Sequence, residues 1–147
     1  GDLFFKGNDS LKKIKDIIHL EIRKYRDHFK NSKEGFMKYW PKSYEVKGWL
    51  ISMKSGGKLS PHIHGDGWLS GSIYINVPPK SKIDSGNLVV CLHDNELASN
   101  QNKNKNNIDV ITGSLCLFPA SLHHYTIPFE SKEDRIVLAF DVTPSHS

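Results

Sequence analysis

The N-terminal part of the chain alternates apolar and charged residues with the spacing of an amphipathic helix. Between residue 9 and about residue 30, apolar side chains recur at steps of three and four residues: Leu11, Ile14, Ile18, Ile22, Tyr25 and Phe29. This spacing places them on one helical face, and Asp9 or Ser10 can cap the N-terminus. The sequence therefore predicts one helix that packs its apolar face against the rest of the protein.

From residue 44 onward the pattern changes to short β-like runs separated by turn residues, with no second helix. We expect strands near 44–53, 58–64, 69–77, 86–93, 108–111, 114–118, 123–128 and 134–142. About eight strands at this spacing indicate a mainly β fold, a sandwich or jelly roll. We assign residues 1–43 to an N-terminal helix and connector and residues 44–147 to the β core of the same domain.

The stretch 94–107 interrupts this pattern with asparagine, lysine and other polar residues. It has too little apolar surface to build a packed element, so it predicts a loop. The sequence leaves open whether this loop is a lid or an insertion of no consequence.

Composition and charge narrow the class of protein. At 147 residues the chain is the size of one ordinary domain, and its apolar runs are too short for a membrane span. The net charge of +4 is unevenly placed, because residues 1–47 contain 12 Lys and Arg against 7 Asp and Glu, a charge of +5, whereas residues 48–147 carry −1. We interpret this excess as the solvated face of the helix rather than a nucleic-acid-binding surface.

Two cysteines, Cys91 and Cys116, lie inside apolar runs and are expected to act as small buried hydrophobic residues. A chain with so few cysteines fits a reducing compartment, and we expect a cytoplasmic protein. The chain begins with Gly1 rather than Met, which leaves open that it belongs to a longer parent protein.

The segment Pro61-His62-Ile63-His64-Gly65-Asp66 carries the strongest chemical signal. Side chains alternate along a strand, so residues 62, 64 and 66 would project from one face. Two imidazoles and a carboxylate with open coordination positions suit a non-haem ferrous centre. A distal ligand should come from another strand; His124 is the best candidate, whereas His123 would point the other way.

Arg135 is the second signal. The chain has seventeen Lys but three Arg, and Arg135 lies outside the N-terminal helix at the start of a strand of buried character. An isolated Arg in a Lys-rich chain indicates planar, bidentate recognition of a carboxylate. It is the natural partner for a dicarboxylate cosubstrate.

The order of these motifs resembles the iron(II)/2-oxoglutarate-dependent oxygenase superfamily, in particular small oxygenases with a Pro-His-x-His segment. The similarity covers roughly residues 44–142 and rests on Pro61-His62-Ile63-His64, Leu69-Ser70-Gly71-Ser72-Ile73-Tyr74-Ile75, Phe118-Pro119-Ala120-Ser121-Leu122-His123-His124, and Asp134-Arg135. It implies a double-stranded β-helix, Fe(II), and 2-oxoglutarate and dioxygen as cosubstrates, usually for hydroxylation of a small-molecule or peptide substrate. In related proteins this domain can follow helical repeats.

Within this resemblance, His62, His64 and His124 would hold the metal as the catalytic centre. Arg135 would bind the far carboxylate of 2-oxoglutarate, and Tyr74 or Ser70 would add a hydrogen bond. The superfamily usually has an acid two residues after the first His, where this chain has His64. The alternative register, His64-Gly65-Asp66, restores that pattern with Asp66 as the ligand. In the first register Asp66 would instead orient a ligand imidazole.

Two other classes of protein share some of these features. A three-His cupin, a dioxygenase or isomerase, is supported by Gly56 followed by His62 and His64, and by Gly113 followed by Pro119 and His124. A cupin has no general need for Arg135, which therefore favours the oxygenase. The other class is a non-catalytic jelly-roll binding module, which turnover of 2-oxoglutarate would exclude.

Overall fold

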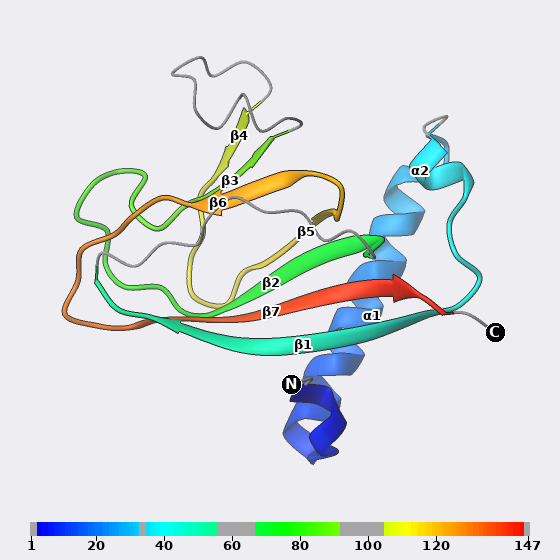
Figure 1. Ribbon diagram of the computed structural model, residues 1–147, viewed down its shortest axis with the longest axis horizontal. Helices are drawn as coiled ribbons and strands as arrows, with labels where there is room; N and C mark the ends of the chain where they lie inside the picture. The colour runs from blue at the N-terminus through cyan, green and yellow to red at the C-terminus, as the bar shows by residue number, and fades with distance from the viewer. Residues whose placement is uncertain (1–2, 33–34, 56–66, 92–104, 146–147) are drawn as a thin grey trace.

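Two antiparallel sheets and one long helix form the protein (Figure 1). The computed structural model describes residues 3–32, 35–55, 67–91 and 105–145. One sheet has the strand order β1 (Tyr44–Met53), β7 (Arg135–Pro144), β2 (Leu69–Asn76) and β5 (Leu115–Pro119). The other has the order β4 (Lys105–Ile108), β3 (Leu88–Cys91) and β6 (His123–Thr126). This arrangement confirms the predicted mainly β, jelly-roll fold with an N-terminal helix.

The predicted helix is α1 (Asp9–Phe29), and it packs across the outer face of the four-stranded sheet (Figure 1). Ile18 and Ile22 are fully buried in a core cluster with sheet residues such as Leu69 and Val142. The predicted N-cap was wrong by one or two residues, because Asn8 is the cap. Its extended backbone lets its side chain accept a hydrogen bond from the Leu11 amide at 3.1 Å. Short helical turns, η1 (Leu3–Lys6) and α2 (Gly35–Lys38), flank α1.

Gly71 allows β2 and β7 to pack closely under the helix. It pairs with Phe140, whose ring lies over the glycine so closely that a Cβ there would come within 2.2 Å of the Phe140 Cζ. Any side chain at this position would displace the ring. The contact therefore couples the two central strands to the core beneath α1.

The predicted boundary between the loop at 94–107 and the strand at 108–111 was wrong, because the strand begins earlier. Residues 105–108 form β4, which pairs with β3 from Leu88 opposite Ile108 to Cys91 opposite Lys105. Asn87 also donates a side-chain hydrogen bond to the Asn107 carboxamide oxygen at 2.9 Å. Backbone pairing at a sheet edge needs no apolar side chains, which is why composition predicted a loop here. The remainder of that loop, and the strand predicted at 58–64, lie outside the described residues.

A second core fills the space between the two sheets. It contains Tyr74, Leu88, Val90, Val110, Phe118 and Val137. Cys91 is buried and Cys116 half-buried, and neither forms a disulfide, as predicted. None of the helices in the described part of the chain is long and apolar enough to cross a membrane.

Candidate functional site

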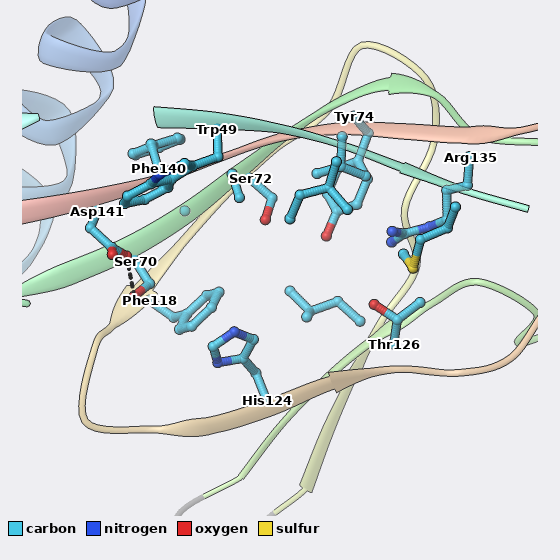
Figure 2. Close-up of a pocket in the computed structure, with 16 residues that line it drawn as sticks. Trp49, Ser70, Ser72, Tyr74, Phe118, His124, Thr126, Arg135, Phe140 and Asp141 are labelled. Atoms are coloured by element: carbon cyan, nitrogen blue, oxygen red, sulfur yellow. Dashed lines mark hydrogen bonds between the residues drawn. The ribbon is translucent and has the colours of Figure 1, made fainter. Parts of the chain in front are cut away.

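A cavity of about 170 Å³ lies between the two sheets (Figure 2). Most of its lining is apolar and comes from inward-facing residues of β1, β2 and β7, with β3, β5 and β6 completing the wall. Its polar side chains are Ser70, Ser72, Tyr74, His124, Thr126, Arg135 and Asp141. A mostly apolar cavity with a few polar groups is the usual form of a small-molecule site.

Arg135 is the most unusual of these polar residues. It is the first residue of β7 and is 2% exposed, yet no carboxylate among the described residues pairs with it. Its Nη2 donates to the Gly86 carbonyl at 3.2 Å, while its buried Nε has no hydrogen-bond partner within the described part of the chain. Gly86 adopts φ of 74°, a left-handed conformation that favours glycine.

The positive charge of Arg135 is therefore not balanced by a carboxylate of the described residues. Burial lowers the pKa of its guanidinium, an effect that neighbouring Tyr74 opposes. Arginine nevertheless keeps its charge in proteins, and a buried charge that no carboxylate of the described residues balances costs several kcal/mol. The site is suited to a bound anion, above all a planar carboxylate that the guanidinium can hold through two hydrogen bonds.

Tyr74 lies next to Arg135 and faces the same space (Figure 2). The guanidinium carbon lies 5.2 Å from the centre of its ring, a cation–π contact. Burial raises the pKa of Tyr74 to about 12, with Cys116 adding to the rise and Arg135 opposing it. The phenol therefore keeps its proton at neutral pH and can donate a hydrogen bond to an anion held by Arg135.

His124 enters the cavity from the opposite sheet. It belongs to β6, where it pairs with Val90 of β3, and its ring lies 4.9 Å from the ring of Phe118. His123, the preceding residue, does not line the cavity, in agreement with the alternation expected for a strand. The structure thus brings His124, Arg135 and Tyr74 around one space.

Ser70 and Asp141 form a polar pair on the same cavity wall, away from Arg135 (Figure 2). They face each other across β2 and β7, and the Ser70 hydroxyl donates to Asp141 Oδ1 at 3.3 Å. Ser70 was predicted as a cosubstrate contact, and that role stays a prediction. Asp141 was not predicted, although its position six residues after Arg135 on one strand already places it on the same face.

The other predicted metal ligands, His62, His64 and Asp66, lie outside the described residues. Within the residues that the structure does describe, no three His, Cys, Asp or Glu side chains come together to hold a metal ion. His124 is therefore the predicted ligand whose position is known.

The comparison with protein families matches a model described as "Putative 2OG-Fe(II) oxygenase" over residues 47–141. The chain belongs to this oxygenase family. The match includes every cavity-lining residue, from Trp49 to Asp141. It decides between the oxygenase and the cupin in favour of the oxygenase. The comparison with curated proteins finds no match.

Several solved structures share the fold of this chain. A prolyl hydroxylase from Trichoplax adhaerens, in complex with a hypoxia inducible factor peptide fragment, is 21% identical over 90% of this chain and 56% of its own, with a TM-score of 0.60. A Pseudomonas putida prolyl-4-hydroxylase is 17% identical over 69% of this chain and 54% of its own, with a TM-score of 0.53. HygX from Streptomyces hygroscopicus, with nickel and 2-oxoglutarate bound, is 12% identical over 69% and 58%, with a TM-score of 0.50. The chain thus spans little more than half the length of these solved chains.

Proposed function

We propose that this oxygenase is an Fe(II)- and 2-oxoglutarate-dependent dioxygenase that hydroxylates a small molecule or a peptide. The observation that carries the proposal is the buried Arg135, which pairs with no carboxylate of the described residues, in a cavity that it shares with His124. A cavity with a cationic anchor at one end and an imidazole on the opposite wall suits a chelating dicarboxylate and a metal.

The described residues suit 2-oxoglutarate and supply one candidate ligand for the metal. The Arg135 guanidinium can hold the far carboxylate of 2-oxoglutarate, and the protonated Tyr74 phenol can donate a further hydrogen bond to it. The His124 imidazole is a ligand type that ferrous iron accepts. We propose His62 and His64 as the remaining ligands, with Asp66 as the alternative to His62.

The chain's own residues would bind and orient rather than transfer protons. When bound, Fe(II) with 2-oxoglutarate supplies the oxidising power for hydroxylation by dioxygen. Arg135 and Tyr74 would fix the cosubstrate from one end, so that its keto-acid end lies toward His124. Apolar cavity residues, including Leu88 and Val137, would exclude water from the reacting groups.

Peptide substrates belong to the proposal because two of the similar structures are prolyl hydroxylases and one contains a peptide fragment. We also propose a cytoplasmic location, which the two cysteines outside disulfides suit.

Formation of succinate from 2-oxoglutarate tests the function directly. The purified chain with Fe(II), ascorbate, dioxygen and 2-oxoglutarate should form succinate slowly even without a prime substrate. Omission of Fe(II) and the variant Arg135→Ala should each reduce this rate to background. A chain that binds Fe(II) and 2-oxoglutarate but forms no succinate would be a non-catalytic binding module. Failure to bind either group would refute the oxygenase proposal.

A further inference from the structure

A backbone carbonyl holds the Arg135 side chain at one end of the cavity. Arg135 begins β7 in the four-stranded sheet, and its Nη2 donates at 3.2 Å to the carbonyl of Gly86, in the segment that leads into β3 of the other sheet. A guanidinium carries five N–H donors in one plane. The bond to Gly86 fixes the orientation of that plane, while Nε keeps no hydrogen-bond partner within the described residues.

The Gly86 carbonyl can orient the guanidinium because its own segment is fixed. The Gly86 amide donates to the Ile127 carbonyl at 3.0 Å, and the Ile127 amide donates to the Asn87 carbonyl at 2.9 Å. The preceding turn is closed by the Ser85 amide, which donates to the Lys82 carbonyl at 3.2 Å. These backbone bonds tie the segment to the chain that follows β6.

The Asn87 side chain ties the same segment to β4 and the residues after it. It is 5% exposed, and its Oδ1 accepts from the Lys80 ammonium and from the Val110 amide. Its Nδ2 donates to the Asn107 carboxamide oxygen at 2.9 Å. The same ammonium forms an ion pair with Asp109. Removal of the buried carboxamide would leave several polar groups without their partners, so the segment would lose its attachment on this side.

We infer that Asn87 is a positioning residue for the cosubstrate, because it holds the Gly86 carbonyl that orients the Arg135 guanidinium. The inference rests on the proposed function, in which Arg135 binds the far carboxylate of 2-oxoglutarate. Asn87 is not one of the described residues that line the cavity, so it acts through Arg135 and not through contact with the ligand. A planar fork that is oriented before binding loses less freedom when the carboxylate arrives. Asn87 thus contributes to the affinity for 2-oxoglutarate and not to that for the metal.

The Nε–H group of Arg135 reports on the guanidinium without any ligand. The chain has three arginines, and Arg23 and Arg26 are exposed. In a two-dimensional proton–nitrogen NMR spectrum, the arginine Nε–H signal that disappears in Arg135→Lys belongs to Arg135. In Asn87→Ala this signal should shift, and its exchange with water should become at least about threefold faster, because the guanidinium is no longer held in one orientation.

Binding of 2-oxoglutarate to the Mn(II)-loaded protein tests the consequence. Asn87→Ala should raise the Kd for 2-oxoglutarate at least about threefold, while the Kd for Mn(II) stays at the wild-type value. Asn87→Asp should keep most of the affinity, because it retains the oxygen that accepts from Lys80 and the exposed Asn107 carboxamide can rotate to donate.

Lys80→Met provides a second variant that does not remove a buried side chain. It keeps the apolar stem but lacks the ammonium that holds Asn87, so it should change the NMR signal and the Kd for 2-oxoglutarate in the same direction as Asn87→Ala. It decides the matter if Asn87→Ala does not fold. Lys82→Met is the matched control, because Lys82 carries the same charge in the same turn but is exposed. It should leave both measurements at their wild-type values.

Four results would overturn the inference. The wild-type Arg135 signal exchanges as fast as those of the exposed arginines, or the folded Asn87→Ala and Lys80→Met proteins keep the wild-type signal and Kd. Alternatively, Asn87→Ala raises the Kd for Mn(II) by the same factor as that for 2-oxoglutarate, or Lys82→Met acts as strongly as Lys80→Met.

The same measurements separate this inference from the function beneath it. If the wild-type protein fails to bind 2-oxoglutarate, the proposed function fails and the inference falls with it. If the wild type binds 2-oxoglutarate and the folded Asn87 and Lys80 variants bind it equally well, the inference alone is wrong.

Discussion

Among single residues, Arg135 combines deep burial, a permanent charge and the lack of a carboxylate neighbour within the described part of the chain. The sequence had already singled out Arg135, because a lone Arg at the start of an apolar strand stands out in a Lys-rich protein. Asp141 was missed although the same strand carries it. Alternation along the predicted strand 134–142 could have placed it on the face of Arg135, but sequence alone did not show which strand positions line a cavity.

Replacement of Arg135 by Lys tests the carboxylate anchor. Arg135→Lys keeps a positive charge but loses the planar fork, so the Kd for 2-oxoglutarate should rise at least about tenfold. Iron content should stay at the wild-type level, since Arg135 is not a metal ligand. Calorimetric titration of the Mn(II)-loaded protein measures the first quantity and metal analysis the second. Equal losses of metal and 2-oxoglutarate would indicate a folding defect instead.

At the level of secondary-structure elements, apolar periodicity predicted the limits of the strands well, but it did not predict a polar strand at the edge of a sheet. Strands β1, β2, β5 and β7 begin and end within two residues of their predicted limits, because each carries an alternating or continuous apolar pattern. β4 was missed at 105–107 because backbone pairing with β3, rather than side-chain burial, holds it in place.

The N-cap of α1 is Asn8 in the structure, whereas the sequence predicted Asp9 or Ser10. Asn8→Ala should lower the free energy of unfolding by about 1 kcal/mol, because the Leu11 amide loses its side-chain acceptor. Ser10→Ala, at one of the predicted cap positions, should change stability by less than about 0.5 kcal/mol. Urea denaturation followed by circular dichroism gives both values. The reverse order would show that the helix begins later than it does in the structure.

Gly71→Ala tests the close packing of β2 against β7. The new methyl group would meet the Phe140 ring, and forcing it in should cost about 1–3 kcal/mol of stability. The double variant Gly71→Ala with Phe140→Leu should lose less than the sum of the two single variants, since the smaller side chain relieves the clash. Strict additivity in denaturation experiments would show that the two residues do not meet.

At the scale of the whole molecule, the fold brings together side chains that are distant in sequence. His124 comes from one sheet and Arg135 from the other, and their convergence on one cavity follows from the closure of the jelly roll. Motif order alone could indicate this convergence through the family resemblance, but not the shape of the cavity or its second polar end.

The metal centre provides the prediction at this scale. His124→Ala should abolish Fe(II) binding, because a site with three protein ligands loses most of its affinity when one is removed. Comparison of His64→Ala with His62→Ala and Asp66→Ala then identifies the register. Loss of iron in the His62 variant but not in the Asp66 variant supports three histidines, and the opposite result supports a carboxylate ligand. Wild-type iron content in His124→Ala would contradict the assignment of this residue.

The most direct test of the central claim is an anaerobic titration of the Fe(II)-loaded protein with 2-oxoglutarate, followed by visible absorption. Chelation of iron by the keto acid produces a charge-transfer band, which we expect to saturate at one 2-oxoglutarate per chain. In Arg135→Lys the same band should require at least about tenfold more 2-oxoglutarate. Absence of the band from the wild-type protein, or an identical titration of the two proteins, would contradict a 2-oxoglutarate site anchored by Arg135.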